Sequence, residues 1–148
     1  MIRIRGTLLP ENIVLNLDVQ SRAEAVQKVT ETLRADFRIS NWEEFLRALR
    51  AREVVGKVNL EFGLTMPHVR TSAVTKMLMA FGRITGPVLD NKVPIQFVIL
   101  VGIPGTMDSE YLRLVGMLMR VFREEKLRCK LITAEDAEGI LVVFEQAA

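Results

Sequence analysis

The chain has 148 residues, a length typical of one compact domain, and 49% of them are hydrophobic, which is enough for an ordinary core. Its 20 basic side chains nearly balance its 18 acidic ones, and the arginines are scattered, so a basic patch that binds nucleic acid is not expected. The single cysteine, Cys129, excludes an intrachain disulfide and a clustered Cys/His zinc site, and it favours a reducing compartment.

The sequence contains no segment that is typical of export or of a membrane span. The N-terminal residues 1–5 are basic, but the apolar core of a signal peptide does not follow them. The longest uncharged stretch, residues 93–107, is short for a transmembrane helix and is interrupted by prolines and glycines. We therefore expect a soluble, cytoplasmic protein without membrane insertion.

A strand and a helix are predicted in the first part of the chain. Residues 13–17, with the sequence Ile-Val-Leu-Asn-Leu, are typical of a strand. The pattern from Ser21 to Glu24 is that of a capping box, and apolar residues follow it at helical spacing. This combination predicts a helix over residues 22–35.

A second helix is expected to begin after Ser40 or Asn41, either of which can cap it, and to end at Gly56. Its buried stripe is expected to consist of Trp42, Phe45 and Leu49. The next position on the same stripe holds Arg52. An arginine on an inward-facing stripe either extends its charged group to solvent or meets an anion, and the sequence leaves both interpretations open.

The only histidine, His68, ends the segment Gly63-Leu64-Thr65-Met66-Pro67-His68. Residues 64–66 are typical of a strand, and Pro67 cannot donate a ladder hydrogen bond, so His68 is expected in a loop just beyond a strand end. Such loops commonly carry reactive groups, and a neutral imidazole is a nucleophile and a base near pH 7. The alternative is a histidine that fills a surface turn and has no chemical role.

Two apolar runs, residues 77–81 and 97–101, lack polar alternation and are expected to be strands that are covered on both faces. The turn-rich piece between them is too short for a crossover helix. The two strands are therefore expected to pair either in antiparallel fashion or through a third short segment.

Three further helices are predicted after the second of these strands. They are expected to run from a cap at Asp108 or Ser109 to Phe122, over residues 124–132, and from a capping box in residues 133–136 to Phe144. The order of strands and helices predicts a single α/β domain over residues 1–148, with a sheet between helical layers.

Several of these segments resemble the type-2 enzyme IIA domains of the bacterial phosphotransferase system, a group with fructose, mannitol and nitrogen-regulatory members. The resemblance is carried by residues 9–17, residues 21–26, the helix end Arg52-Glu53 and residues 63–68, which are similar to the family signature Gly-Ile-Ala-Ile-Pro-His. It extends over nearly the whole chain. It implies a mixed sheet of about five strands, flanked by helices on both faces.

The resemblance also implies a function and a site. His68 would accept a phosphoryl group from the histidine-containing phosphocarrier protein, and Arg52 would stabilise the phosphate. The chain would be a phosphoryl carrier in a nitrogen-regulatory or sugar-uptake role, with a permease domain or a regulatory target protein downstream and with no cofactor or metal. Where family members often have a second histidine, this chain has Tyr111, whose hydroxyl is a candidate phosphate contact and whose ring is alternatively a packing group.

The chain departs from the family at a glycine-rich loop between the arginine and the histidine, where it has residues 58–62, Val-Asn-Leu-Glu-Phe. Backbone amides near Gly63 are expected to bind phosphate oxygens instead. Leu64, Met66 and Val69 are expected as apolar contacts for partner proteins. The departures keep a second function open, a regulatory binding module of the same fold in which phosphorylation is weak or lost. A metal hydrolase or a Ser/His enzyme is not supported, since no matching constellation is present.

Overall fold

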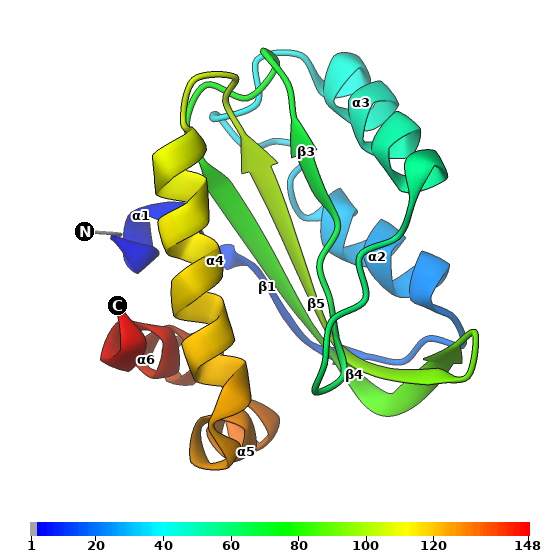
Figure 1. The fold of residues 1–148 in the computed structure, drawn as a ribbon, viewed down its shortest axis with the longest axis vertical. Helices are drawn as coiled ribbons and strands as arrows, with labels where there is room; N and C mark the ends of the chain where they lie inside the picture. The colour runs from blue at the N-terminus through cyan, green and yellow to red at the C-terminus, as the bar shows by residue number, and fades with distance from the viewer. Residues whose placement is uncertain (1–2) are drawn as a thin grey trace.

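The computed structural model describes residues 3–148, and a five-stranded mixed sheet lies at its centre with helices on both faces (Figure 1). The predicted fold class is therefore confirmed. In chain order the elements are α1 (Ile4–Thr7), β1 (Leu8–Leu17), α2 (Arg22–Glu31), α3 (Trp42–Val55), β2 (Leu64–Thr65), β3 (His68–Arg70), β4 (Leu78–Asp90), β5 (Val93–Ile103), α4 (Asp108–Arg123), α5 (Glu125–Thr133) and α6 (Ala137–Ala147). None of the helices within residues 3–148 is both long enough and apolar enough to cross a membrane.

The strands are ordered β1-β4-β5-β2, and β3 also pairs with β5, so β2 and β3 follow one another along the outer edge of β5. Strands β4 and β5 form an antiparallel hairpin, which decides between the two pairings that the sequence left open. The hairpin turns at Asn91 and Lys92, whose φ angles of 49° and 70° are those of a type I′ turn. The turn-like residues 85–87 lie inside β4, where the register shifts between Arg83 and Val88.

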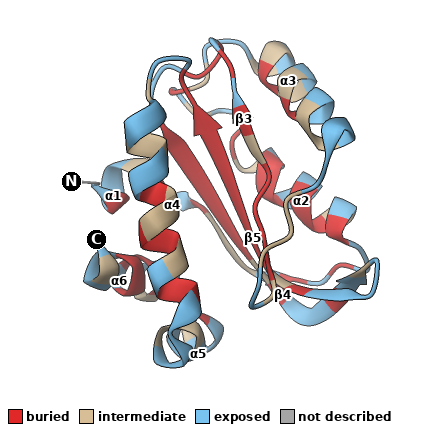
Figure 2. Cartoon of the chain, viewed as in Figure 1, coloured by how far each residue is buried: buried red, intermediate tan, exposed pale blue. Residues whose placement is uncertain are grey.

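The sheet separates two hydrophobic cores, because successive side chains of a strand point to opposite faces. On β5, Phe97, Ile99 and Val101 belong to the core beneath α4, α5 and α6. Val98 and Leu100 belong to the core beneath α2 and α3. Figure 2 shows most of β5 and the first half of β4 as buried, as predicted for the apolar runs 77–81 and 97–101, whereas the hairpin end of the two strands is largely exposed.

The start of α2 and the start of α3 carry the caps that the sequence indicates. The Ser21 hydroxyl accepts a hydrogen bond from the Glu24 amide at 3.1 Å, and the Asn41 side chain accepts one from the Glu44 amide at 3.1 Å. Each bond satisfies an amide that has no partner within the first helical turn. Of the two caps proposed for α3, the structure therefore selects Asn41.

The predicted caps of α4 and α6 are wrong. Helix α4 has Met107 at the capping position, with no side-chain hydrogen bond, and Asp108 is already its first helical residue. An acidic residue is favoured anywhere in the first turn by the helix dipole, so its presence does not identify the cap. Helix α6 is capped by Asp136, which accepts from the Gly139 amide at 2.9 Å, whereas Thr133 still belongs to α5.

Helix α2 ends at Glu31 and not at residue 35 as predicted. Its last turn tightens into bonds between residues three apart, including one from the Leu33 amide to the Thr30 carbonyl at 3.0 Å. The Thr32 hydroxyl donates to the Val29 carbonyl at 2.7 Å and competes with the regular helical bond. Apolar periodicity does not report this local competition.

Candidate functional site

His68 is the first residue of β3, at the outer edge of the sheet. Pro67 interrupts the edge strand because it has no amide hydrogen, but its carbonyl accepts from the Val101 amide at 3.0 Å. Pairing then resumes, with His68 opposite Val101. The prediction that His68 lies in a loop beyond the strand end is therefore wrong. The pairing is interrupted at Pro67, as expected, but only at this residue, because β5 extends past it and pairs with the residues that follow.

The hydrogen bonding of the His68 ring assigns its tautomer. The ring is half-buried, and Nδ1 lies 3.1 Å from the carbonyl oxygen of Met66. A carbonyl oxygen can only accept, so Nδ1 carries the proton of the neutral ring. Nε2 then keeps its lone pair and is the nitrogen that can act as a nucleophile.

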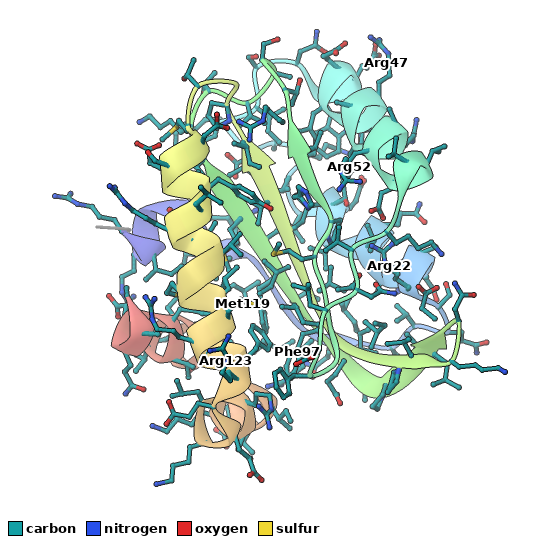
Figure 3. The ribbon with its side chains drawn as sticks, in the orientation of Figure 1. Arg22, Arg47, Arg52, Phe97, Met119 and Arg123 are labelled. Atoms are coloured by element: carbon teal, nitrogen blue, oxygen red, sulfur yellow. The ribbon has the colours of Figure 1, made fainter. Side chains whose placement is uncertain are left out.

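A cavity of about 280 Å³ brings Arg52 and His68 together. Arg52 comes from the last turn of α3, is half-buried, and donates through Nη1 to the Gly56 carbonyl at 2.9 Å. In Figure 3, Arg52 lies between α3 and β3, whereas Arg47 lies at the outer side of the same helix. The cavity is lined by Ala48, Arg52, His68, Val69, Arg70, Ile103 and Tyr111. The two residues that the sequence singled out thus share one pocket, while their roles stay predictions.

Tyr111, from the first turn of α4, covers the His68 ring. The two rings are stacked, with centroids 5.7 Å apart and an interplanar angle of 28°. Burial raises the pKa of the Tyr111 hydroxyl, and this effect outweighs the opposite one from the positive charges of Arg52 and Arg70. The phenol therefore stays protonated near pH 7 and can donate one hydrogen bond.

Arg70 is a second guanidinium of the cavity, and sequence reasoning missed it. It lies two residues after His68 on β3, so both side chains point to the same face. Its Nη1 forms an ion pair with Asp108 Oδ1 at 2.5 Å. The alternation of strand residues is the signal that identifies Arg70, but it applies only where His68 lies in a strand, and Pro67 hides that strand in the sequence.

Comparison with known proteins places this arrangement in a family. The family model described as "Phosphoenolpyruvate-dependent sugar phosphotransferase system, EIIA 2" matches residues 7–147. The chain belongs to this family. It is 30% identical over 141 residues to the "Mannitol-specific phosphotransferase enzyme IIA component" of Staphylococcus aureus, covering 93% of this chain and 94% of that protein.

Two further relatives show different contexts for an EIIA domain of this kind. The chain is 28% identical over 138 residues to the "PTS system 2-O-alpha-mannosyl-D-glycerate-specific EIIABC component" of Escherichia coli. The alignment covers 90% of this chain but only 21% of that longer protein. A crystal structure of "Nitrogen Regulatory Protein IIA-Ntr from Neisseria meningitidis" matches with a TM-score of 0.83 and 25% identity, covering 95% of this chain and 98% of the other.

An ion pair between buried Arg22 and half-buried Glu53 links the chain segments next to the candidate site of this EIIA domain. Arg22 is 3% exposed and donates to the Glu53 carboxylate at 2.6 and 3.3 Å. It also donates to the Thr65 hydroxyl at 2.7 Å. Glu53 directly follows Arg52 on α3, and Thr65 ends β2 shortly before His68. No pattern in the sequence marks Arg22, because an arginine in the first turn of a helix usually faces solvent.

The segment 58–62 does not take over the role of the family's glycine loop. The amide of Leu60 donates to the Leu64 carbonyl at 2.7 Å, so it is occupied within the segment itself. Among the described residues that line the cavity around His68, none comes from this segment. The hypothesis that amides near Gly63 bind the phosphate oxygens therefore receives no support from the structure.

The prediction that Leu64, Met66 and Val69 form apolar contacts with partner proteins is wrong. Leu64, Met66 and Val69 are 0%, 3% and 3% exposed and belong to the two cores. On short edge strands that are covered on both sides, alternate residues enter opposite cores and neither set reaches a partner.

Proposed function

We propose that this EIIA domain is a phosphoryl carrier in which His68 accepts the phosphoryl group through Nε2. The observation that supports this most directly is the contact between His68 Nδ1 and the Met66 carbonyl, which leaves Nε2 with its lone pair. His68 and Arg52 also line the same pocket. The donor is the histidine-containing phosphocarrier protein. The EIIA family of the chain supports this choice of reaction.

The transfer is a displacement at phosphorus between two nitrogen atoms. The lone pair of His68 Nε2 forms a new N–P bond, the N–P bond of the donor phosphohistidine breaks, and the donor nitrogen keeps that electron pair. The Met66 carbonyl holds the Nδ1 proton in place, so the imidazole becomes more positive without rotating. Positioning and charge stabilisation are the main tasks left to the protein.

Arg52 stabilises the charge on the transferring group. A guanidinium stays protonated at any working pH, and its forked donors match pairs of phosphate oxygens. Its bond to the Gly56 carbonyl occupies one N–H and leaves the remaining donors for an anion. Because Arg52 is half-buried in a small cavity, this charge is less screened than one on an open surface.

The phosphoryl group then passes to a downstream permease component or signals to a regulatory target. The names of its relatives point to both, since they include a mannitol-specific component and a nitrogen regulatory protein. To test the carrier function, the purified chain is incubated with labelled phosphoenolpyruvate, the general phosphotransferase enzyme and the phosphocarrier protein. We expect acid-labile label on this chain. A wild-type chain that takes up no label while the phosphocarrier protein is fully labelled would overturn the proposal.

Arg52→Ala is expected to lower the initial rate of phosphoryl uptake by about 10²–10³-fold, the typical cost of removing one preorganised charge-stabilising group. Arg52→Lys should recover part of this loss, because it restores the charge but not the fork. The matched control is Arg47→Ala, which removes an exposed arginine of the same helix that is paired with Glu44. If Arg47→Ala slows uptake as much as Arg52→Ala, the assignment of Arg52 is wrong.

Tyr111→Phe is expected to slow phosphoryl uptake about two- to tenfold, because it removes one neutral hydrogen-bond donor and keeps the ring that stacks on His68. Single-turnover uptake by the two proteins measures the difference. If Tyr111→Phe equals wild type while Tyr111→Ala is slower, Tyr111 is only a packing residue.

The second candidate function is a regulatory binding module in which phosphorylation is weak or lost. Two observations favour it. None of the described residues that line the cavity comes from segment 58–62, and Tyr111 stands where family members often have a second histidine. Capture of partner proteins by the phosphorylated and unphosphorylated chain separates the two functions. A carrier needs only to exchange phosphate, whereas a phosphorylation-dependent switch changes its set of partners.

A further inference from the structure

Strand β3 and the first turn of α4 meet in two matched pairs of side chains. His68 and Arg70 lie on one face of β3, and the residue between them, Val69, points into the opposite core. Asp108 and Tyr111 are three residues apart on α4 and therefore share one side of the helix. The His68 ring stacks on Tyr111, and the Arg70 guanidinium pairs with Asp108.

The Arg70 side chain is within reach of a phosphoryl group on His68. The two residues are separated by about 7 Å along the strand, twice the rise per residue. Both side chains line the same cavity. Burial raises the pKa of the Tyr111 hydroxyl, and the charges of both Arg52 and Arg70 oppose this rise, so both guanidinium groups lie close enough to affect the ring that covers His68.

The ion pair between Arg70 and Asp108 is weak enough for Arg70 to leave it for another anion. The Arg70 and Asp108 side chains are 42% and 74% exposed, and ion pairs between exposed side chains contribute little because water screens them. A carboxylate carries one negative charge, whereas a phosphoryl group near pH 7 carries about 1.5 to 2 and offers three acceptor oxygens. A guanidinium with both anions in reach binds the phosphoryl group more strongly.

We propose that Arg70 is a second phosphoryl-binding residue and that phosphorylation of His68 draws it from Asp108 to the phosphoryl oxygens. This inference rests on the proposed carrier function and adds a cation that supplies the charge a second histidine would otherwise provide. In the unphosphorylated domain Asp108 neutralises Arg70. In the phosphorylated domain Asp108 is released as a free carboxylate at the start of α4, so this helix end differs between the two states.

The test measures the equilibrium constant for phosphoryl exchange between the phosphocarrier protein and this domain, with ³¹P NMR as the readout. This constant depends only on the end states, so a change in docking of the donor alters the rate but not the constant. Arg70→Gln is expected to shift it about tenfold toward the phosphocarrier protein, the scale of one charge-assisted hydrogen bond in a half-exposed site. Asp108→Asn should shift it about threefold the other way, since Arg70 is then free before phosphorylation.

The double variant decides whether the two residues exchange partners. In the Arg70→Gln background, Asp108→Asn should leave the constant unchanged. If Asp108 merely repels the phosphoryl group, Asp108→Asn would shift the constant equally in both backgrounds. That result would overturn the proposal that Arg70 exchanges Asp108 for the phosphoryl group. Arg113→Gln, an exposed arginine of α4, and Glu43→Gln, an exposed acidic residue in the first turn of α3, control for net charge and for helix capping.

The outcomes separate this inference from the carrier function on which it rests. If wild type is phosphorylated on His68 and Arg70→Gln has the same equilibrium constant within twofold, the inference fails and the carrier function stands. If wild type takes up no phosphoryl group, both fail.

Discussion

His68→Ala is expected to reduce phosphoryl uptake to background, because no other side chain in the cavity has a nucleophilic nitrogen with a free lone pair. The remaining basic lining residues, Arg52 and Arg70, stay protonated and cannot attack phosphorus. The chain has no second histidine that could replace the first. Label from the phosphocarrier protein, resolved by gel electrophoresis at neutral or alkaline pH, measures the effect.

The variant must be shown to be folded before the loss of label is interpreted. His68 is half-buried at the sheet edge, and its backbone bonds to β5 do not depend on the side chain, so His68→Ala should retain the thermal transition of wild type within a few degrees. Equal label on wild type and on a folded His68→Ala protein would place the acceptor elsewhere and would remove the basis of the carrier mechanism.

Arg38→Met is expected to lower the free energy of unfolding by about 3–5 kcal/mol, the cost of removing one partner of a buried ion pair. Arg38 is 1% exposed and pairs with Asp36, whose side chain is 3% exposed, at 2.8 Å. It also donates to the carbonyl oxygens of Gly6 and Thr7 at 3.1 and 2.7 Å and to Asn12 Oδ1 at 3.1 Å. The substitution removes all of these side-chain donors and leaves Asp36 only the backbone amide of residue 38, and urea denaturation measures the loss.

The control for this loss is Arg47→Met, which breaks an ion pair whose side chains are 71% and 41% exposed. We expect less than about 1 kcal/mol there, because exposed pairs are screened by water. A similar loss in both variants would mean that the arginine stem, and not the buried network, determines the stability.

Acidification should reduce the difference in the free energy of unfolding between wild type and Arg38→Met. Burial alone would raise the pKa of the Asp36 carboxyl, but the hydrogen bonds and charge of Arg38 outweigh it and hold this pKa below its ordinary value of 3.8. A lowered folded-state pKa stabilises the protein above the unfolded-state value, and this contribution is lost as the pH falls through the folded-state pKa. The variant keeps the backbone hydrogen bond to Asp36 but lacks the part of this contribution that comes from the guanidinium, so the difference between the two free energies of unfolding should shrink below about pH 4.

The sequence singled out Arg52 and His68, which share one cavity in the structure, and it missed Arg70 in the same cavity. Arg52 was identified because it breaks an apolar stripe, and a stripe at helical spacing predicts direction as well as secondary structure. His68 was identified as the only histidine, but its strand was missed because Pro67 interrupts the pattern. Arg70 was missed for the same reason, because its orientation toward the cavity follows from the alternation of side chains along β3.

The buried arginines could not be found by pattern. Arg22 and Arg38 are 3% and 1% exposed, yet each stands where arginine commonly faces water. What makes their burial stable is a set of acceptors from distant parts of the chain, such as Glu53 for Arg22 and Asn12 for Arg38. Those acceptors come together only when the sheet and the helices have packed.

The sequence by itself determined the α/β class, the amphipathic helices, the cap at Ser21, and the pair of residues around which a phosphoryl site is proposed. These features follow from contacts between residues close in the chain, where periodicity and capping act directly. Only the tertiary structure decided the β4–β5 pairing, the second arginine of the cavity and the tautomer of His68. Each of these depends on a backbone or charged group from a distant part of the chain. Local sequence patterns do not show which distant groups come into contact.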